Sequence, residues 1–225
     1  MTTETTLVRG LIKNWQKTYG YLSGQFVRIA SLQQQDKAEI AKHLQALPER
    51  DRYFRFGFAA TDTHIQSYAD GLNFERDHVY GIYNREALLV AVAHVAQMSE
   101  PHQAPLSFGL GYSQKAEFGV SVLPAYRSKG YGGRLFNRAV THARNQGISQ
   151  FHIQALTENS RMLHIAKKRG ATLVNFGSET EAHLLLPKAD LDSRMSELVA
   201  EHFGNVDYSI AHRKNPYKAF ALQGF

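Results

Sequence analysis

The sequence predicts a mixed α/β fold, built as one domain with an extension at each end. Its 225 residues are 43% hydrophobic and 20% charged, which is the balance of an ordinary globular protein with a single core. Strand-like and helix-like patterns alternate along the chain instead of forming separate blocks, as is typical of mixed α/β sheets. At 120–135 a β-rich run passes through a glycine-rich turn directly into an amphipathic helical stripe.

The first half of the pattern follows from apolar periodicity and from the residues that interrupt it. Pro48 ends the first helix because proline lacks the N–H that a helix interior needs. Thr61 begins the second helix because its hydroxyl can accept a hydrogen bond from the first turn. The expected elements are a strand over 25–32, helices over 33–47 and 61–70, and a hairpin of strands over 78–83 and 87–95.

The second half alternates more regularly between the two periods. Gly147 and Gly170 each follow a helical stripe, where glycine is the usual C-terminal stop. The expected elements are a strand over 115–122, a helix over 131–146, a strand over 150–156, a helix over 159–169, and strands over 171–176 and 181–186.

The pattern divides the chain into a main domain over 25–187, an N-terminal extension over 1–24 and a C-terminal helical extension over 188–225. In the last of these, an apolar stripe from Leu191 to Phe203 follows a helical period. Packing of this stripe within the chain is the default expectation, and a homodimer contact is the alternative. A monomer or a homodimer is therefore expected.

Composition excludes several classes of protein. There are no cysteines, which excludes disulfides, thiolate metal sites and cysteine nucleophiles. No apolar run approaches the roughly 20 residues that span a bilayer, and the first residues lack a secretory signal pattern, so a cytoplasmic protein without a membrane partner is expected. The net charge of +6 permits phosphate-rich partners, but the charge is scattered, so nucleic acid is not expected as a partner.

The glycine-rich turn over 127–133 has the properties of an anion site. It places free backbone N–H groups at a helix N-terminus, where they and the helix dipole attract phosphate oxygens. Gly130 and Gly132 let the backbone approach a phosphate closely, and Arg127 and Lys129 add positive charge. A purely structural turn explains such a loop about as well. The Walker and three-glycine dinucleotide patterns are both absent, which disfavours nucleotide hydrolysis and hydride transfer.

The segment from Arg127 to Gly132 is similar to the acetyl-CoA motif of the GNAT superfamily of N-acetyltransferases, Gln/Arg-x-x-Gly-x-Gly/Ala. The stretch over 159–171 resembles the downstream helix of that family, which begins at an asparagine. The resemblance implies a GNAT-like fold with a mixed, mostly antiparallel central sheet flanked by helices, and acetyl-CoA as co-substrate. It also implies that the coenzyme is held by Val122, Arg127, Ser128, Lys129, Gly130, Tyr131, Gly132, Gly133 and Asn159.

The same resemblance implies direct attack of an amine on the thioester, assisted by positioning and backbone N–H groups. Glu117 is the candidate general base, because it lies on the strand that leads to the loop and a carboxylate among apolar neighbours can be partly desolvated. An outward-facing polar residue is the equally weighted alternative. Ala166 stands where the family usually has a tyrosine that protonates the departing thiolate, so solvent or another tyrosine is left for that role.

Three further features each carry two interpretations. His94 is a substrate contact or base, or a core histidine bonded to backbone, and the second is favoured. His164 is more simply a solvated histidine. The cluster over 52–58 offers arginines and aromatics that can grip an anionic or planar substrate, or a helix that buries Phe54 and Phe58. No histidines show metal-ligand spacing, so no metal is expected.

Three functions remain in order of preference. The first is acetyl-CoA-dependent N-acetylation of a primary amine, on a small molecule or a protein. The second is a regulatory module that binds acyl-CoA without turnover, which the missing tyrosine motivates. The third is a nucleic-acid-associated protein, which the net charge alone motivates.

Overall fold

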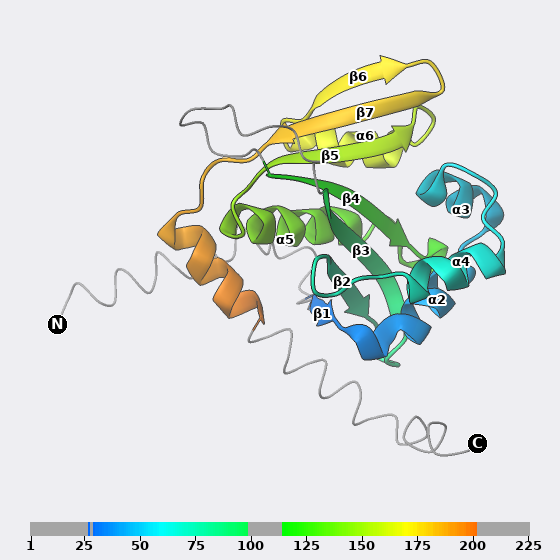
Figure 1. Ribbon diagram of the computed structural model, residues 1–225. Helices are drawn as coiled ribbons and strands as arrows, with labels where there is room; N and C mark the ends of the chain where they lie inside the picture. The colour runs from blue at the N-terminus through cyan, green and yellow to red at the C-terminus, as the bar shows by residue number, and fades with distance from the viewer. Residues whose placement is uncertain (1–26, 28, 99–113, 202–225) are drawn as a thin grey trace.

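The computed structural model describes residues 27, 29–98 and 114–201, which form a seven-stranded sheet with helices against both faces (Figure 1). The strand order is β1-β2-β3-β4-β5-β7-β6, and only the β4–β5 pair is parallel. This confirms the expected mixed, mostly antiparallel sheet. The strands are β1 (Ala30–Leu32), β2 (His78–Tyr83), β3 (Leu89–Met98), β4 (Gln114–Val122), β5 (Ile148–Leu156), β6 (Thr172–Phe176) and β7 (Glu179–Leu185).

Two short 3-10 turns and a set of α-helices connect these strands. Pro48 was expected to end a helix, and it is also the N-cap of the next helix, α3. The hydrophobic periodicity did not predict α3 as a separate helix. The helical elements are η1 (Gln34–Asp36), α2 (Lys37–Gln45), α3 (Glu49–Phe56), α4 (Asp62–Asp70), η2 (Pro124–Tyr126), α5 (Tyr131–Asn145), α6 (Ser160–Lys168) and a last helix over 191–201.

The sheet is packed on both faces in its first half. On one face α5 buries its apolar stripe, and Phe136 meets Phe118 of β4 edge to face at a centroid distance of 5.0 Å. On the other face α2 and α4 bury residues such as Ile40 and Ile65 against β1, β2 and β3. Strand β3 is therefore apolar on both sides and reads as a continuous hydrophobic run.

Strands β4 and β5 separate toward their C-terminal ends. Their pairing runs from Gln114 opposite Ile148 to Glu117 opposite His152 and stops there, although β4 continues to Val122 and β5 to Leu156. Beyond that point β4 stays paired with β3, and β5 stays paired with β7. Two facing strand edges in the described sheet thus lack a strand partner, and their backbone groups are available to a ligand.

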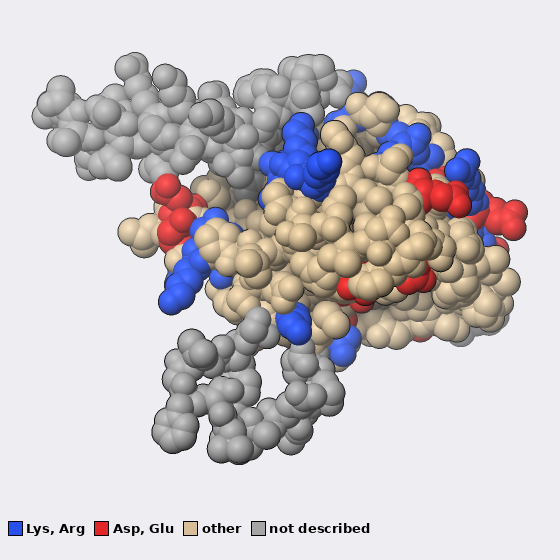
Figure 2. Space-filling view, turned by 90° about the horizontal axis from the view of Figure 1, so that it is seen from above, with Lys and Arg blue, Asp and Glu red and all other residues tan. Residues whose placement is uncertain are grey.

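The second half of the sheet, β5, β7 and β6, carries α6 on one face, while the residues of β6 are exposed. Seen from above, the Lys and Arg side chains of the described residues form separate groups with uncharged surface between them (Figure 2). Across the described ranges, every helix is too short or too polar to span a bilayer.

The helix over 191–201 does not pack as its apolar stripe predicted. Leu191, Met195 and Leu198 are 82%, 48% and 61% exposed. The polar face instead contacts α5, where the Glu197 carboxylate accepts from His142 Nδ1 at 2.5 Å and from Arg138 at 3.2 Å. The default expectation of an apolar intramolecular contact is therefore wrong for these residues, because charge pairing holds the helix. The N-terminal extension over 1–24 lies outside the described residues.

Candidate functional site

A cavity of about 1080 Å³ opens where β4 and β5 separate. Its floor is the end of β4, and one wall is the loop 127–130 with the first turn of α5 and the start of α6. The opposite wall is α3, which extends over this end of the sheet (Figure 1). The predicted coenzyme residues Val122, Arg127, Ser128, Gly130, Tyr131, Gly132, Gly133 and Asn159 all line this one cavity.

The glycine-rich loop ends in a backbone turn that suits an anion. Ser128 and Gly130 both have positive φ values, of 60° and 75°, and Gly130 is the N-cap of α5. No side chain caps the first turn of α5, and that turn contains no acidic residue. The N–H groups of the first turn and the positive end of the helix dipole therefore face the cavity, which is what a pyrophosphate requires.

Two residues of the predicted cradle have other roles. Lys129 is not part of the cavity lining, and its ammonium lies 4.8 Å from the ring centroid of Tyr126. Gly132 lines the cavity, and a Cβ there would come within 3.0 Å of Ile165 Cδ1, so this glycine also lets α6 pack against α5. Of the two glycines, Gly130 is the one that the loop conformation itself requires.

Basic side chains surround the mouth of the cavity. Arg127 donates from Nε to the Val122 carbonyl at 3.2 Å and forms an ion pair with Asp51 of α3, which ties the loop to the opposite wall. Burial lowers the pKa of Arg134, which also lines the cavity. Further basic lining residues are Arg161, Lys168 and Arg169, all on or just after α6.

The start and the core-facing side of α6 differ in what they can offer a ligand. The Asn159 side chain accepts from the Met162 backbone N–H at 3.3 Å, so it caps the helix while lining the cavity. Ala166 is fully buried in the core and offers no hydroxyl. The tyrosines that line the cavity are Tyr126 and Tyr131, and His164 is an exposed residue of its rim.

Glu117 lies at the last paired position of β4 and β5 and is exposed. The partly desolvated position that its apolar neighbours suggested is therefore wrong, because Ala116 and Phe118 point to the opposite face. Its carboxylate does not belong to the cavity lining, but its charge reaches Tyr68 and helps to raise the pKa of that hydroxyl, which burial raises most.

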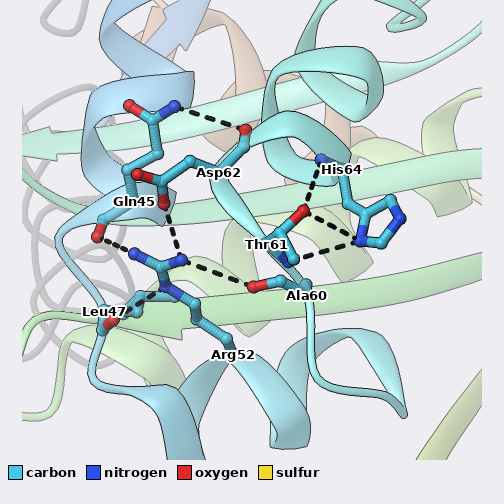
Figure 3. A network of polar contacts seen from close by, with 7 residues as sticks. All are labelled: Gln45, Leu47, Arg52, Ala60, Thr61, Asp62 and His64. Atoms are coloured by element: carbon cyan, nitrogen blue, oxygen red, sulfur yellow. Dashed lines mark hydrogen bonds and ion pairs between the residues drawn. The ribbon is translucent and has the colours of Figure 1, made fainter.

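The arginine cluster of 52–58 separates into a structural and a cavity-facing member. Arg52 joins α3 to the end of α2 and the start of α4 through hydrogen bonds (Figure 3). Its guanidinium donates to the Asp62 carboxylate at 2.7 Å and to the carbonyls of Gln45, Leu47 and Ala60. These bonds occupy its guanidinium. Phe58 is 47% exposed and α3 buries no side chain fully, so the expectation that this helix buries Phe54 and Phe58 is wrong.

Arg55, on the same helix, lines the cavity and lies flat against β4. A Cβ at Gly119 would be 2.8 Å from its Cζ and 3.0 Å from both terminal nitrogens. The guanidinium donates to the Tyr68 hydroxyl at 2.6 Å, and that oxygen lies 2.8 Å from His94 Nδ1. His94 Nε2 in turn lies 3.3 Å from the buried Asp77 carboxylate.

These contacts with Tyr68 and Asp77 decide the role of His94. Burial and the charge of Arg55 lower its pKa to about 4, so the ring is neutral at physiological pH. It is a half-buried histidine with side-chain partners, and not a backbone-bonded one as expected. It does not line the cavity.

A second contact from the early helices meets β4 two residues further on. His43 of α2 is buried between the Leu89 carbonyl, 2.9 Å from Nδ1, and the Ser121 hydroxyl, 2.8 Å from Nε2. Because Nδ1 faces a carbonyl it carries the proton, so Nε2 accepts from Ser121. The remaining lone pairs of Ser121 Oγ are left for the cavity that this residue lines.

Two groups in the described ranges have the residue types of a metal site, and neither belongs to the cavity lining. His152, His183 and Glu181 lie on the face of β5 and β7 that is opposite α6. His142, Glu197 and Glu201 lie between α5 and the last helix, where Arg138 already bonds both carboxylates. The expectation of no metal stays a prediction.

Comparison with known proteins agrees with this geometry. The model of the acetyltransferase (GNAT) domain matches residues 27–172 of the 225, more than half of the chain. The GNAT domain of S. lividans PAT is 16% identical with a TM-score of 0.58, over 72% of this chain and 92% of that one.

Two other solved structures have the same fold. Salmonella typhimurium yncA, a putative acetyltransferase solved with acetyl-CoA, is 17% identical with a TM-score of 0.52, over 74% of this chain and 97% of its own. The Vibrio cholerae spermidine N-acetyltransferase, solved with CoA and spermine, is 13% identical with a TM-score of 0.52, over 71% and 95%. The chain therefore belongs to the GNAT family of acetyltransferases and is an N-acetyltransferase by class.

Proposed function

We propose that this protein transfers the acetyl group of acetyl-CoA directly to a primary amine, within the cavity between β4 and β5. The observation that carries the proposal is the uncapped first turn of α5, which borders the same cavity as the separated strands. One feature suits the pyrophosphate and the other suits the amide groups of pantetheine, because an unpaired strand edge offers both N–H and C=O groups.

The residues proposed to hold the coenzyme act mainly through backbone. The first turn of α5 and the loop from Arg127 to Gly130 receive the pyrophosphate, and Arg134 with the basic residues of α6 neutralises the phosphates. The edge of β4 up to Val122 binds pantetheine, and Asn159 lies near it. When bound, the coenzyme supplies an acetyl group activated as a thioester.

An amine must lose its proton before it attacks, and Glu117 is the proposed acceptor of that proton. Its carboxylate is on the face of β4 that carries Arg55 and Ser121, at the point where the strands part. Because it is exposed and outside the cavity lining, water carries the proton to it. No metal and no covalent intermediate are needed in this scheme.

The proposal is tested by titrating acetyl-CoA in a thermal-shift assay and then following release of free thiol over a panel of amines, amino acids, polyamines and peptides. Stabilisation by acetyl-CoA and amine-dependent thiol release are the expected results. No stabilisation would refute coenzyme binding. Stabilisation without thiol release from any amine would favour an acyl-CoA-binding module, the alternative that the buried Ala166 motivates.

A further inference from the structure

Arg55 is a cation in the cavity lining that forms no ion pair with a carboxylate of the described residues. Its polar partner in the described residues is the Tyr68 hydroxyl, which is neutral because burial raises its pKa. Asp77 is the acid at the far side of His94 in this series of contacts. Its carboxylate already accepts from two nitrogens of Arg76, at 2.7 and 2.8 Å. The charge of Arg55 is therefore not neutralised within its own network.

The chain of hydrogen bonds fixes where this cation points. Arg55 donates to Tyr68, so the hydroxyl proton of Tyr68 is directed to the neutral His94 Nδ1. The absence of a side chain at Gly119 lets the guanidinium lie on the strand, where Arg55 forms part of the cavity lining. A planar guanidinium held in this way matches a carboxylate, which it can bind through two parallel hydrogen bonds.

Arg55 lies over β4, whereas the proposed phosphate site is at the loop and the first turn of α5. Gly119, which Arg55 covers, lies three residues before the end of β4 at Val122, about 10 Å along an extended strand. The positive groups that line the loop side are separate from it and come from α5 and α6. The position next to the parting of β4 and β5 belongs to the acceptor end of the cavity.

Acceptor oxygens for an amine lie on both sides of this cation. Glu117 and Ser121 are each two residues from Gly119 on the same face of β4, about 7 Å along the strand. An amine that is joined to a carboxylate by a short linker can therefore reach Ser121 directly, or Glu117 through water, while its carboxylate is on Arg55.

We propose, on the basis of the function above, that the acceptor is a small amino acid, whose carboxylate is bound by Arg55 and whose amine is acetylated. Tyr68 and His94 are positioning residues for that guanidinium. A polyamine is a poorer fit, because it has no carboxylate for Arg55 and brings further positive charge beside that guanidinium, while the acids of the cavity lining, Asp51 and Glu158, are both paired with arginines.

The test compares matched acceptors on the full chain. The panel contains the common amino acids with β-alanine and γ-aminobutyrate, each paired with its carboxamide, and spermidine and putrescine. Binding to the CoA-saturated protein is measured by calorimetry, and acetylation by thiol release. At least one amino acid should exceed its carboxamide about ten- to hundred-fold in kcat/KM, the value of a bond between charged groups. Arg55→Gln should reduce that ratio to near one and leave acetyl-CoA affinity unchanged.

Arg50→Gln is the control, because it removes the same charge from the cavity lining at an exposed residue that pairs with Glu158 at 3.6 Å. It should keep the preference for carboxylates. Tyr68→Phe should raise KM for the amino acid several-fold with little change in kcat, which a general loss of structure would not do.

The outcomes separate the inference from the function on which it rests. Equal acetylation of acids and amides, preference for a polyamine, or equal effects of Arg50→Gln and Arg55→Gln would overturn the inference while the acetyltransferase function stands. If no amine is acetylated, calorimetric binding to the CoA-saturated protein still tests the proposed carboxylate site. An amino acid that binds the wild type but not Arg55→Gln supports the site, and the absence of such binding refutes it.

Discussion

The two walls of the cavity are built in different ways. The proposed coenzyme wall is mainly backbone, from the end of β4, one glycine-rich turn and the first turn of α5, with the start of α6 beside them. The acceptor wall is α3 over one face of β4, where side chains of α2, α4 and β3 behind the lining hold Ser121 and Arg55, and Glu117 lies on the same face just outside the lining. Backbone sites are shared by a whole family, whereas side-chain sites distinguish its members.

Arg52 and Arg55 show the difference within a single helix. The first is saturated by protein oxygens and joins three helices, while the second has one hydroxyl partner and faces the cavity. Their sequence context is nearly the same, so structure alone assigns stability to one and recognition to the other.

The largest expected effect lies on the acceptor wall. Glu117→Gln should lower kcat by about 100-fold or more at neutral pH, because it removes the proposed proton acceptor. The dissociation constant of acetyl-CoA should not change. Glu181→Gln, which changes a partly exposed carboxylate on β7, is the control. A kcat within a few-fold of wild type in steady-state assays would remove Glu117 from the mechanism.

The proposed coenzyme wall can be tested separately by a substitution in the glycine-rich loop. Gly130→Asp should weaken acetyl-CoA binding by about 100-fold, because it places a side chain at a φ of 75° and a negative charge at the start of α5. Gly177→Asp has the same backbone cost, at a φ of 79° in the β6–β7 turn, and should bind normally. Calorimetric titration of both variants checks this, and equal affinities would refute the assigned cradle.

The stability of two variants tests the different roles of Arg52 and Arg55. Arg52→Gln should lower the free energy of unfolding by about 2–3 kcal/mol, because several buried carbonyls lose a charged donor. Arg55→Gln should change it by less than about 1 kcal/mol. Urea denaturation measures both, and a larger loss for Arg55→Gln would reverse the assignment.

The smallest effect at neutral pH concerns the buried histidines. Burial, with the Arg55 charge, holds the pKa of His43 and of His94 at about 4, against 6.5 in the unfolded chain. Between these values the unfolded state binds protons that the folded state does not, so stability falls as the pH drops from 6.5 to 4 and is flat above 6.5. Melting temperatures should follow this course, and His94→Gln should reduce the slope. The exposed His164→Gln should not, and equal slopes for all three proteins would contradict the shift.

The sequence by itself determined the order of the strands and of the helices other than α3, and it placed the proposed coenzyme loop at the start of α5. These depend on local chemistry: hydrophobic period, and a glycine that must adopt a positive φ at the start of α5. Even here the inference was coarser than the structure, since Gly132 serves packing against Ile165 and Lys129 lies outside the cavity.

Only the tertiary structure decided what surrounds the acceptor end. The parting of β4 from β5 at Glu117, the contact of Arg55 with Gly119 and the Tyr68–His94 chain each join residues that are distant in sequence. The exposed apolar face of the last helix likewise depends on the ion pairs that its polar face makes with α5. Such contacts follow from how elements pack across the sheet, and periodicity along one element does not contain that information.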